Sequence, residues 1–259
     1  MRVYGWSIDW DVRRLAEVDS TNRYLLDEAR AGAPEGVVVV AEHQTAGRGR
    51  LGRRWWAPEG SSLLMSVLLR PTLPPERLHL AAAALALAAS DACQAETGVR
   101  PGLKWPNDLV VEDLAGDALP WHERKLGGVL AEVDLPAVVV GLGLNMNWAL
   151  GERAAEPPAH VLDRAVALDH LAGRSIDGHA LLDRLLASLG HLVLHWGEVA
   201  SQYRRHCVTV GRPVRVELVG ETIAGTAEDI DADGRLVVST NRGPRTVSTA
   251  DVVHLRPGR

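Results

Sequence analysis

The stretch HQTAGRGRLGRRWW, residues 43–56, combines four arginines with three glycines, and no acidic residue lies between Glu42 and Glu59. Glycine lets a backbone approach a ligand closely, and arginine supplies a fixed fork of hydrogen-bond donors. The loop therefore favours anion binding, although a solvated turn or a nucleic-acid patch also fits these residues.

Read literally, Gly47-x-Gly49-x-x-Gly52 also matches the dinucleotide-binding pattern. That pattern requires its third glycine to open a helix and an acidic residue about 20 positions later to bind the ribose. Here Gly52 leads into RRWWAPEG, a poor helix former, and positions 61–75 contain no Asp or Glu. A dinucleotide fold is therefore disfavoured.

Apolar runs on both sides place this loop between two strands. Residues 37–41 form a continuous β-branched run, and residues 62–69 form a second apolar run, as in strands with both faces buried. Further strands are predicted over 103–105, 109–112, 125–134 and 137–144, the first two joined by a turn around Pro106-Asn107-Asp108. Helices are predicted from Asn22 to Gly32, from Pro74 to Gly98, over 162–172 and over 177–205, with Gly190 and Gly197 as candidate breaks.

After Cys207 the pattern changes to short alternating strands separated by glycine turns, from Val208 to Leu255. This spacing predicts a small all-β, barrel-like module. The chain is thus expected to be α+β, with one domain over residues 1–206 and a small β domain over 207–259.

Composition limits the class of protein. The 259 residues are 46% hydrophobic and 24% charged, with a formal charge of −5, which argues against disorder and against a general nucleic-acid coat. Two cysteines are too few for a disulfide scaffold. The N-terminus lacks the pattern of a signal peptide, and the longest apolar run, 80–89, is half a membrane span. A cytoplasmic protein without membrane segments is expected.

Four further stretches accompany the arginine loop: Ser20-Thr21-Asn22 with Gln44, KWPND at 104–108, KLGG at 125–128 and GLGLNMN at 141–147. In order, spacing and chemistry this set resembles the biotin-protein ligases, over about residues 17–148, and the C-terminal β domain also fits. The resemblance implies a mixed-sheet catalytic domain of the biotin/lipoate ligase, class II synthetase-like type, with a small SH3-like β-barrel.

The resemblance also implies a two-step reaction. Biotin and ATP, with Mg²⁺, form biotinyl-5′-AMP, and the acyl group passes to a lysine of a biotin carboxyl carrier protein domain of a biotin-dependent carboxylase. Positioned cations are needed because a carboxylate must attack a polyanion, and a closing loop is needed because the adenylate is sensitive to water. The ligands of the metal are not indicated.

Site roles follow residue by residue from the resemblance. The catalytic residues are expected to be Lys125, Arg48, Arg50 and Asp108. Biotin is expected to contact Ser20, Thr21, Asn22, Gln44, Gly47, Arg48, Gly49, Arg50, Lys125 and Gly128. ATP is expected to contact Arg50, Arg53, Trp55, Lys104, Asn107, Lys125, Asn145 and Asn147. Without the resemblance, Ser20 would be a helix cap, Lys104 and Asp108 turn residues, and one of Trp55 and Trp56 an ordinary core residue.

Three departures from the family pattern stand out: a long segment over 113–124, Gly127 where alanine is common, and Leu51 where the position is often basic. A helix-turn-helix domain needs about 60 residues, and only 19 precede Ser20, so no specific DNA binding is expected. A homodimer is compatible with the resemblance, but no stretch identifies its interface. The alternatives are lipoate-protein ligase or another acyl-adenylate-forming protein ligase, and more distantly a non-catalytic nucleic-acid-binding protein.

Overall fold

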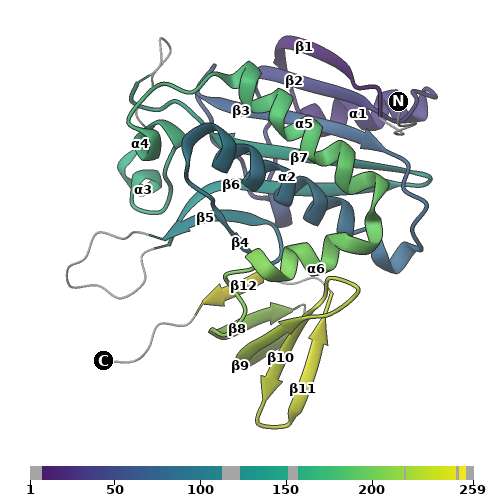
Figure 1. The fold of residues 1–259 in the computed structure, drawn as a ribbon, viewed down its shortest axis with the longest axis vertical. Coiled ribbons are helices and arrows are strands. Elements are labelled where there is room, and N and C mark those ends of the chain that lie inside the picture. The colour runs from purple at the N-terminus through teal and green to yellow at the C-terminus, as the bar shows by residue number, and fades with distance from the viewer. Residues whose placement is uncertain (1–7, 113–122, 151–156, 219, 249–250, 255–259) are drawn as a thin grey trace, which may run out of the picture.

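Seven strands form a mixed sheet in the order β1-β2-β3-β7-β6-β5-β4 (Figure 1). The computed structural model describes residues 8–112, 123–150, 157–218, 220–248 and 251–254, so most of the long 113–124 segment lies outside the described residues. The strands are β1 Asp11–Val18, β2 Val37–Gln44, β3 Ser62–Leu69, β4 Gly102–Lys104, β5 Asp108–Glu112, β6 Glu123–Asp134 and β7 Ala137–Asn145.

Hydrophobicity explains the centre of this sheet. All eight residues of β3 are buried, and β2 and β7 are nearly as apolar, so they occupy central positions. The sequence analysis missed β1, which pairs parallel with β2 at the sheet edge. Its sequence DVRRLAEV is charged and largely exposed, as is common for edge strands, and it therefore carries little hydrophobic signal.

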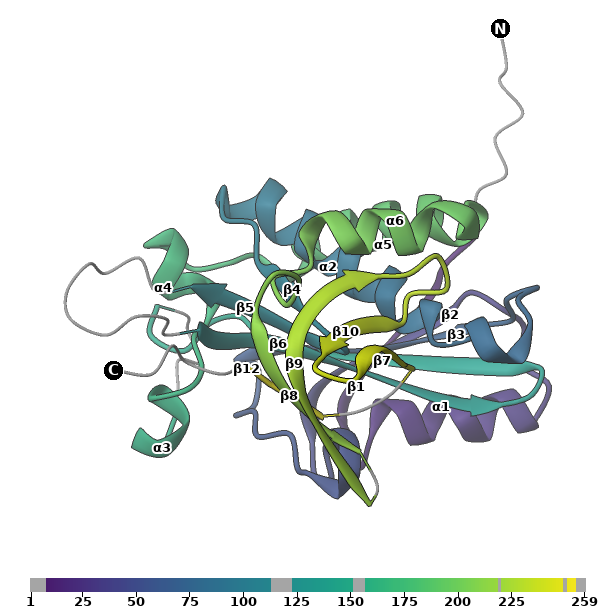
Figure 2. The same cartoon turned by 90° about the horizontal axis from the view of Figure 1, so that it is seen from below.

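Helices cover both faces of the sheet (Figure 2). Helix α1, Thr21–Arg30, packs against β2, β3 and β7 on one face. Helices α2, Leu80–Thr97, α5, Gly178–Leu194, and α6, Trp196–His206, lie on the other face. A short 3₁₀ turn, Pro75–Arg77, precedes α2. The segment Pro75–Thr97 is long and apolar enough to cross a membrane, but 72% of its most apolar window is buried inside the protein, which is typical of a core helix.

Two helix predictions are corrected by the structure. The helix expected over 162–172 is two short helices, α3 Ala159–Leu162 and α4 Leu168–Ala172, because residues 164–166 instead pair with the main chain of Lys125. The helix expected over 177–205 breaks between α5 and α6 at His195, whose backbone is non-helical, and neither Gly190 nor Gly197 marks the break.

A second, antiparallel sheet of five strands follows α6, in the order β11-β10-β9-β8-β12. Its strands are β8 Pro213–Leu218, β9 Glu221–Ile230, β10 Leu236–Thr240, β11 Gly243–Val247 and β12 Asp251–His254, of which β12 was not among the predicted strand segments. The indole N–H of Trp105 donates to the Gly234 carbonyl across the two sheets, at 3.2 Å. The division of the chain at residues 206 and 207 stays a prediction.

Candidate active site

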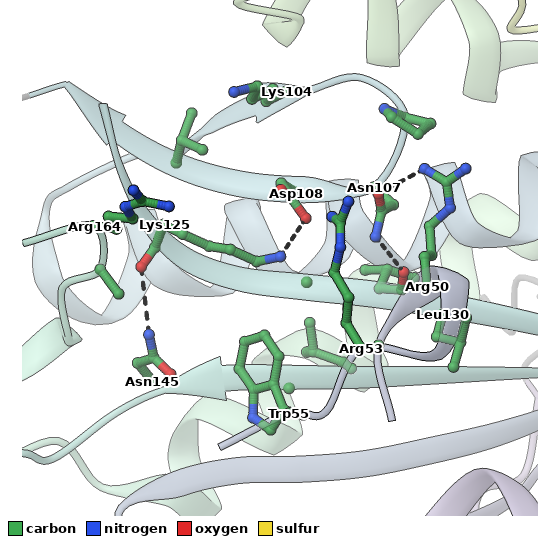
Figure 3. Close-up of a pocket in the computed structure, with 18 of the residues that line it drawn as sticks. Arg50, Arg53, Trp55, Lys104, Asn107, Asp108, Lys125, Leu130, Asn145 and Arg164 are labelled. Atoms are coloured by element: carbon green, nitrogen blue, oxygen red, sulfur yellow. Dashed lines mark hydrogen bonds and ion pairs between the residues drawn. The ribbon is translucent and has the colours of Figure 1, made fainter. Parts of the chain in front are cut away.

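A cavity of about 920 Å³ is lined by residues of the large sheet, the start of α1 and the C-terminal sheet. Most of the predicted site residues line it. They are Ser20, Thr21, Asn22, Gln44, Arg48, Gly49, Arg50, Arg53, Trp55, Lys104, Asn107, Asp108, Lys125, Gly128 and Asn145. Figure 3 shows the part of the cavity around Lys125, where side chains from β5, β6, β7 and the arginine loop point toward one another.

At one end of the cavity, the first turn of α1 presents buried polar groups. Ser20 is the N-cap residue with extended backbone, but its side chain makes no capping hydrogen bond, so helix capping does not account for its hydroxyl. The backbone N–H of Thr21 donates to Oε1 of Gln44 at 2.8 Å. The side chains of Thr21 and Asn22 continue into a buried polar network described below.

That network contains two residues that the sequence analysis missed. The Oγ atom of Ser66 lies 2.7 Å from Oγ1 of Thr21 and 2.6 Å from Oδ1 of Asn22. The Asn22 amide nitrogen donates to the Leu130 carbonyl at 3.1 Å and to Oε2 of Glu132 at 2.8 Å. Ser66 sits in the middle of the apolar strand β3, so only the packing of β3 against α1 shows that it reaches Thr21 and Asn22.

The arginine loop folds back on itself and docks on the KWPND turn. Arg48 and Arg54 form an antiparallel bridge, and the Gly49 N–H donates to the Arg53 carbonyl at 2.6 Å. The Arg50 guanidinium donates to Oδ1 of Asn107 at 3.2 Å. Within the loop, Leu51 adopts a positive φ of 55°, which is uncommon for a residue other than glycine, and it is 73% exposed.

Lys125 lies on the cavity floor between a carboxylate and an aromatic ring (Figure 3). Its Nζ is 2.6 Å from Oδ1 of Asp108 and 5.5 Å from the centre of the Trp55 ring, a cation–π distance. The Lys125 N–H donates to Arg164 and its carbonyl accepts from Val166, at 2.7 and 3.0 Å. Strand β6 and these two hydrogen bonds to residues 164–166 therefore fix the backbone of Lys125, and its ammonium group lies in the cavity.

Two glycines make room for Trp55. A Cβ atom at Gly143 would lie 2.5 Å from Cε2 of Trp55, and one at Gly128 would lie 3.3 Å from Cζ3, so the indole rests on bare backbone. Trp56 is 39% exposed and contacts Trp148 edge to face, with ring centroids 6.3 Å apart. Both tryptophans line the cavity, and neither belongs to the buried core, whereas one of them was expected there.

A cluster of charges joins the cavity to the C-terminal sheet. Glu123 forms an ion pair with Lys104 and accepts a hydrogen bond from Nδ1 of His254 at 2.8 Å, while Nε2 of His254 lies 3.1 Å from Oγ1 of Thr209. Burial raises the pKa of Glu123, but the hydrogen bonds from His254 and Lys104 outweigh it and lower the pKa to about 2. The sequence analysis did not single out His254 or Glu123.

This shifted pKa predicts a pH dependence of stability. A carboxylate with a lowered folded-state pKa stabilises the fold above its ordinary pKa of 4.5, and this contribution is lost as the pH falls toward about 2. Urea unfolding at pH 7, 4.5 and 3 is therefore expected to show a smaller fall in the free energy of unfolding for Glu123→Gln than for the wild type. Glu17→Gln, which removes an exposed carboxylate from β1, serves as the control, and equal falls for Glu123→Gln and the wild type would contradict the assignment.

Two predicted site residues do not line this cavity. Gly47, in the arginine loop, lines a smaller cavity of about 480 Å³. Asn147 is buried, and its amide exchanges two hydrogen bonds with the main chain of Ile176, at 2.9 and 2.8 Å. The structure therefore gives Asn147 a role in holding the segment before α5, and the expected nucleotide contact finds no support in this geometry.

Lys104 and Lys125 are the only lysines in the chain, against 26 arginines. Both line the same cavity. Lysine differs from arginine in being a compact point charge with a nucleophilic amine when deprotonated, so the two residues are not interchangeable. Both lysine side-chain amines of the chain therefore lie at this cavity.

The loop over residues 47–54 is expected to be mobile without ligand and to become ordered when biotin binds, because three glycines are costly to order and four arginines repel one another. Tryptic cleavage after Arg48 to Arg54 should be rapid in the free protein, slower with biotin, and slowest with a non-hydrolysable biotinyl-adenylate mimic. Cleavage after Arg242, in the turn between β10 and β11, provides an internal reference. Equal loop cleavage in the three states would show that the loop does not close.

Comparison with known proteins places this fold and site in a known class. The profile of the biotin/lipoate A/B protein ligase family matches residues 15–147, and the biotin protein ligase C terminal domain matches residues 209–255. The chain belongs to the biotin/lipoate A/B protein ligase family.

The similar proteins fall in the biotin branch of that family. The biotin--[acetyl-CoA-carboxylase] ligase of Mycobacterium tuberculosis is 38% identical over 252 residues, covering 93% of this chain and 88% of the relative. The ligase of the same name from Paracoccus denitrificans is 29% identical, covering 92% of this chain and 98% of the relative. The structure of the biotin protein ligase from Aquifex aeolicus in complex with biotin and ATP has a TM-score of 0.78 at 27% identity, covering 95% and 99% of the two chains.

Proposed function

We infer that this chain is a biotin-protein ligase, which activates biotin with ATP to biotinyl-5′-AMP and transfers the biotinyl group to a lysine. The observation that carries this inference is that one cavity holds a buried polar end, formed by Thr21 and Gln44, and a cationic end, formed by Lys125 and the arginine loop. A cyclic urea fits the first and a carboxylate beside a phosphate fits the second.

In the first step a biotin carboxylate oxygen attacks the α-phosphorus of ATP, a new P–O bond forms, and the bond to pyrophosphate breaks. Both reactants are anions, so the barrier depends on positive charge placed where negative charge builds up. Lys125 supplies an ammonium group on the cavity floor, and Asp108 holds it in place at 2.6 Å. Arg48 and Arg50 extend from the loop above it and would contact the carboxylate and phosphate oxygens.

In the second step a lysine amine attacks the acyl carbon of the adenylate. The C–N bond forms, the bond to the AMP oxygen breaks, and the amine loses a proton. The Asp108 carboxylate lines the cavity and is placed to orient the amine and to accept this proton. Its present partner, Lys125, would turn toward the phosphate once the nucleotide is bound.

The adenine ring would pack against Trp55, whose indole nitrogen is buried without a hydrogen-bond partner among the described residues. Arg53 and Asn145 line the same region of the cavity. Asn145 donates its amide to the Val166 carbonyl at 3.0 Å, so it also keeps the segment after α3 in contact with β7. The nucleotide contacts of Arg53, Lys104, Asn107 and Asn145 are part of this proposal.

Magnesium is part of the proposed reaction. Mg²⁺ usually binds through one or two carboxylates together with substrate phosphates and retained water molecules. Among the described residues no group of three or more His, Cys, Asp or Glu side chains is gathered, and Asp108 and Asp163 line the cavity, which fits a metal ion that enters with the nucleotide. Bound there, Mg²⁺ would offset the charge of the phosphate oxygens.

The acceptor we propose is a biotin carboxyl carrier protein domain of a biotin-dependent carboxylase, in the cytoplasm. The state of the cysteines is compatible with that compartment, because both are buried and neither forms a disulfide. We further propose that the protein does not bind an operator sequence, and that it is able to form a homodimer.

The proposal is tested by measuring pyrophosphate release with ATP and, in parallel, biotin, lipoate or RNA. Biotin is expected to give release that stops near one equivalent per protein and resumes when a carrier domain is added. Release with lipoate in place of biotin would favour the lipoate-ligase alternative. No release with either acid, combined with RNA binding at physiological salt, would favour a nucleic-acid-binding protein.

A further inference from the structure

We propose that His254, on strand β12 of the C-terminal sheet, is a positioning residue that directs the side chain of Lys104 in the cavity. The C-terminal sheet would then contribute to nucleotide binding through a residue of the large sheet. The inference deepens the proposed function and rests on it, because the group that Lys104 would meet is a phosphate of ATP.

The main chain on both sides of Lys104 is anchored to the segment that precedes β8. The Val208 N–H donates to the Leu103 carbonyl at 2.9 Å, and the Trp105 N–H donates to Oγ1 of Thr209 at 3.0 Å. Thr209 is buried, so water has little access to this hydrogen bond. The backbone of Lys104 is therefore fixed, and the direction of its long side chain remains to be set.

Glu123 sets that direction. One carboxylate oxygen, Oε1, forms the ion pair with Nζ of Lys104, and the other, Oε2, lies 2.8 Å from Nδ1 of His254. The low pKa of Glu123 keeps this carboxylate ionised at neutral pH, so it has only lone pairs to offer, and Nδ1 must carry the hydrogen and donate it. The His254 side chain is only 9% exposed, which shields the bond from solvent.

His254 also reaches the main-chain anchor. Its other nitrogen, Nε2, lies 3.1 Å from Oγ1 of Thr209, the same atom that accepts the Trp105 N–H. The hydroxyl is able to donate to a neutral Nε2 and to accept from a protonated one, so the contact is available in either charge state of the imidazole. One imidazole thus connects the carboxylate that holds the Lys104 side chain with the hydroxyl that holds the next main-chain N–H.

A neighbouring cation competes for the same carboxylate. The Arg212 guanidinium forms an ion pair with Glu112 and also lies 4.0 Å from Oε2 of Glu123, the oxygen that His254 contacts. Without the imidazole, Glu123 would turn toward Arg212 and away from Lys104. The Lys104 ammonium group would then sample several directions, and part of the free energy of ATP binding would be lost in ordering it again.

The test measures pyrophosphate release in the first turnover as a function of ATP and of biotin concentration. His254→Ala is expected to raise the half-saturating ATP concentration about five- to tenfold, the effect of losing one fixed contact to a charged group. The half-saturating biotin concentration should stay within about twofold, because the proposed ureido site at Thr21 and Gln44 does not involve Lys104. Arg245→Ala, which removes an exposed ion pair with Glu221 from the same sheet, is the matched control and should change neither value.

Two conservative variants separate positioning from general loosening of the C-terminal sheet. The amide nitrogen of asparagine lies where Nδ1 lies in histidine, and that of glutamine lies closer to the place of Nε2. His254→Asn should therefore keep the donor to Glu123 and bring the half-saturating ATP concentration back toward that of the wild type, whereas His254→Gln should resemble His254→Ala. Equal values for the asparagine and glutamine variants would overturn the proposal.

A double variant shows whether His254 acts through Lys104. In a Lys104→Ala background, His254→Ala should change the half-saturating ATP concentration by less than about twofold, because the ammonium group that it directs is gone. Additive effects would overturn the role of His254 and leave the proposed function intact. If the wild type releases no pyrophosphate with biotin and ATP, it is the proposed function that fails.

Discussion

Lys125→Ala is expected to slow the formation of biotinyl-5′-AMP at least about a hundredfold, in line with loss of a preorganised charged donor. The ammonium group sits on the cavity floor beside Asp108 and Trp55, where charge would build up between carboxylate and phosphate. Because the stabilisation is needed mainly in the transition state, kcat for pyrophosphate release should fall much more than the affinity for biotin.

Two further variants give this prediction a control and a contrast. Arg174→Ala, which removes a surface cation bound to Glu96, should leave the rate unchanged. Lys125→Arg should recover only part of the rate, since the planar guanidinium cannot replace a point charge in the same space. Near-normal pyrophosphate release by Lys125→Ala would move the catalytic role to Lys104, the other lysine of the cavity.

The second large effect is expected for Arg48→Ala, which should release the adenylate from the site. Arg48 is half exposed, and its guanidinium is 4.0 Å from Glu132, so it is free to close over a bound acyl-adenylate. Without it, the activated biotinyl group should escape and label lysines of an added bystander protein at least about ten times faster, because a single charged contact is worth a factor of this size.

The scarcity of lysine sharpens that experiment. The chain has 2 lysines, both in the cavity, so the released adenylate should label the bystander strongly and the enzyme itself hardly at all. Arg54→Ala is the matched comparison, because Arg54 lies in the same loop but donates to the Thr45 carbonyl at 3.4 Å. Bystander labelling no faster with Arg48→Ala than with Arg54→Ala would show that Arg48 does not retain the intermediate.

The fold was predictable where the sequence is strongly apolar. β3 and β7 are largely apolar and were predicted close to their observed bounds, and the apolar run 37–41 predicted the first five residues of β2. The edge strand β1 was missed because charged and exposed residues interrupt its apolar ones, so no apolar run marks it. A break in the helix over 177–205 was anticipated at Gly190 or Gly197, but it lies at His195, where no glycine or proline marks it.

The site residues also divide into those that a local sequence pattern indicates and those that it does not. Arg48, Lys125 and Gln44 could be named in advance because their spacing in the loop, in KLGG and at the strand end resembles a known family. Ser66, Glu132 and His254 could not, because each is a single polar residue whose partner lies 44, 110 or 131 positions away in the chain.

The sequence by itself therefore determined the class of fold, the order of most of its elements and a set of site residues most of which line the cavity, because periodicity, glycine placement and motif spacing are local properties. Tertiary structure alone decided that residues 164–166 hold the backbone of Lys125 and that His254 reaches Glu123. It also decided that the Asn147 amide exchanges hydrogen bonds with the main chain of Ile176. These assignments depend on which buried polar groups find partners across the sheets, and that is settled only when the whole core packs.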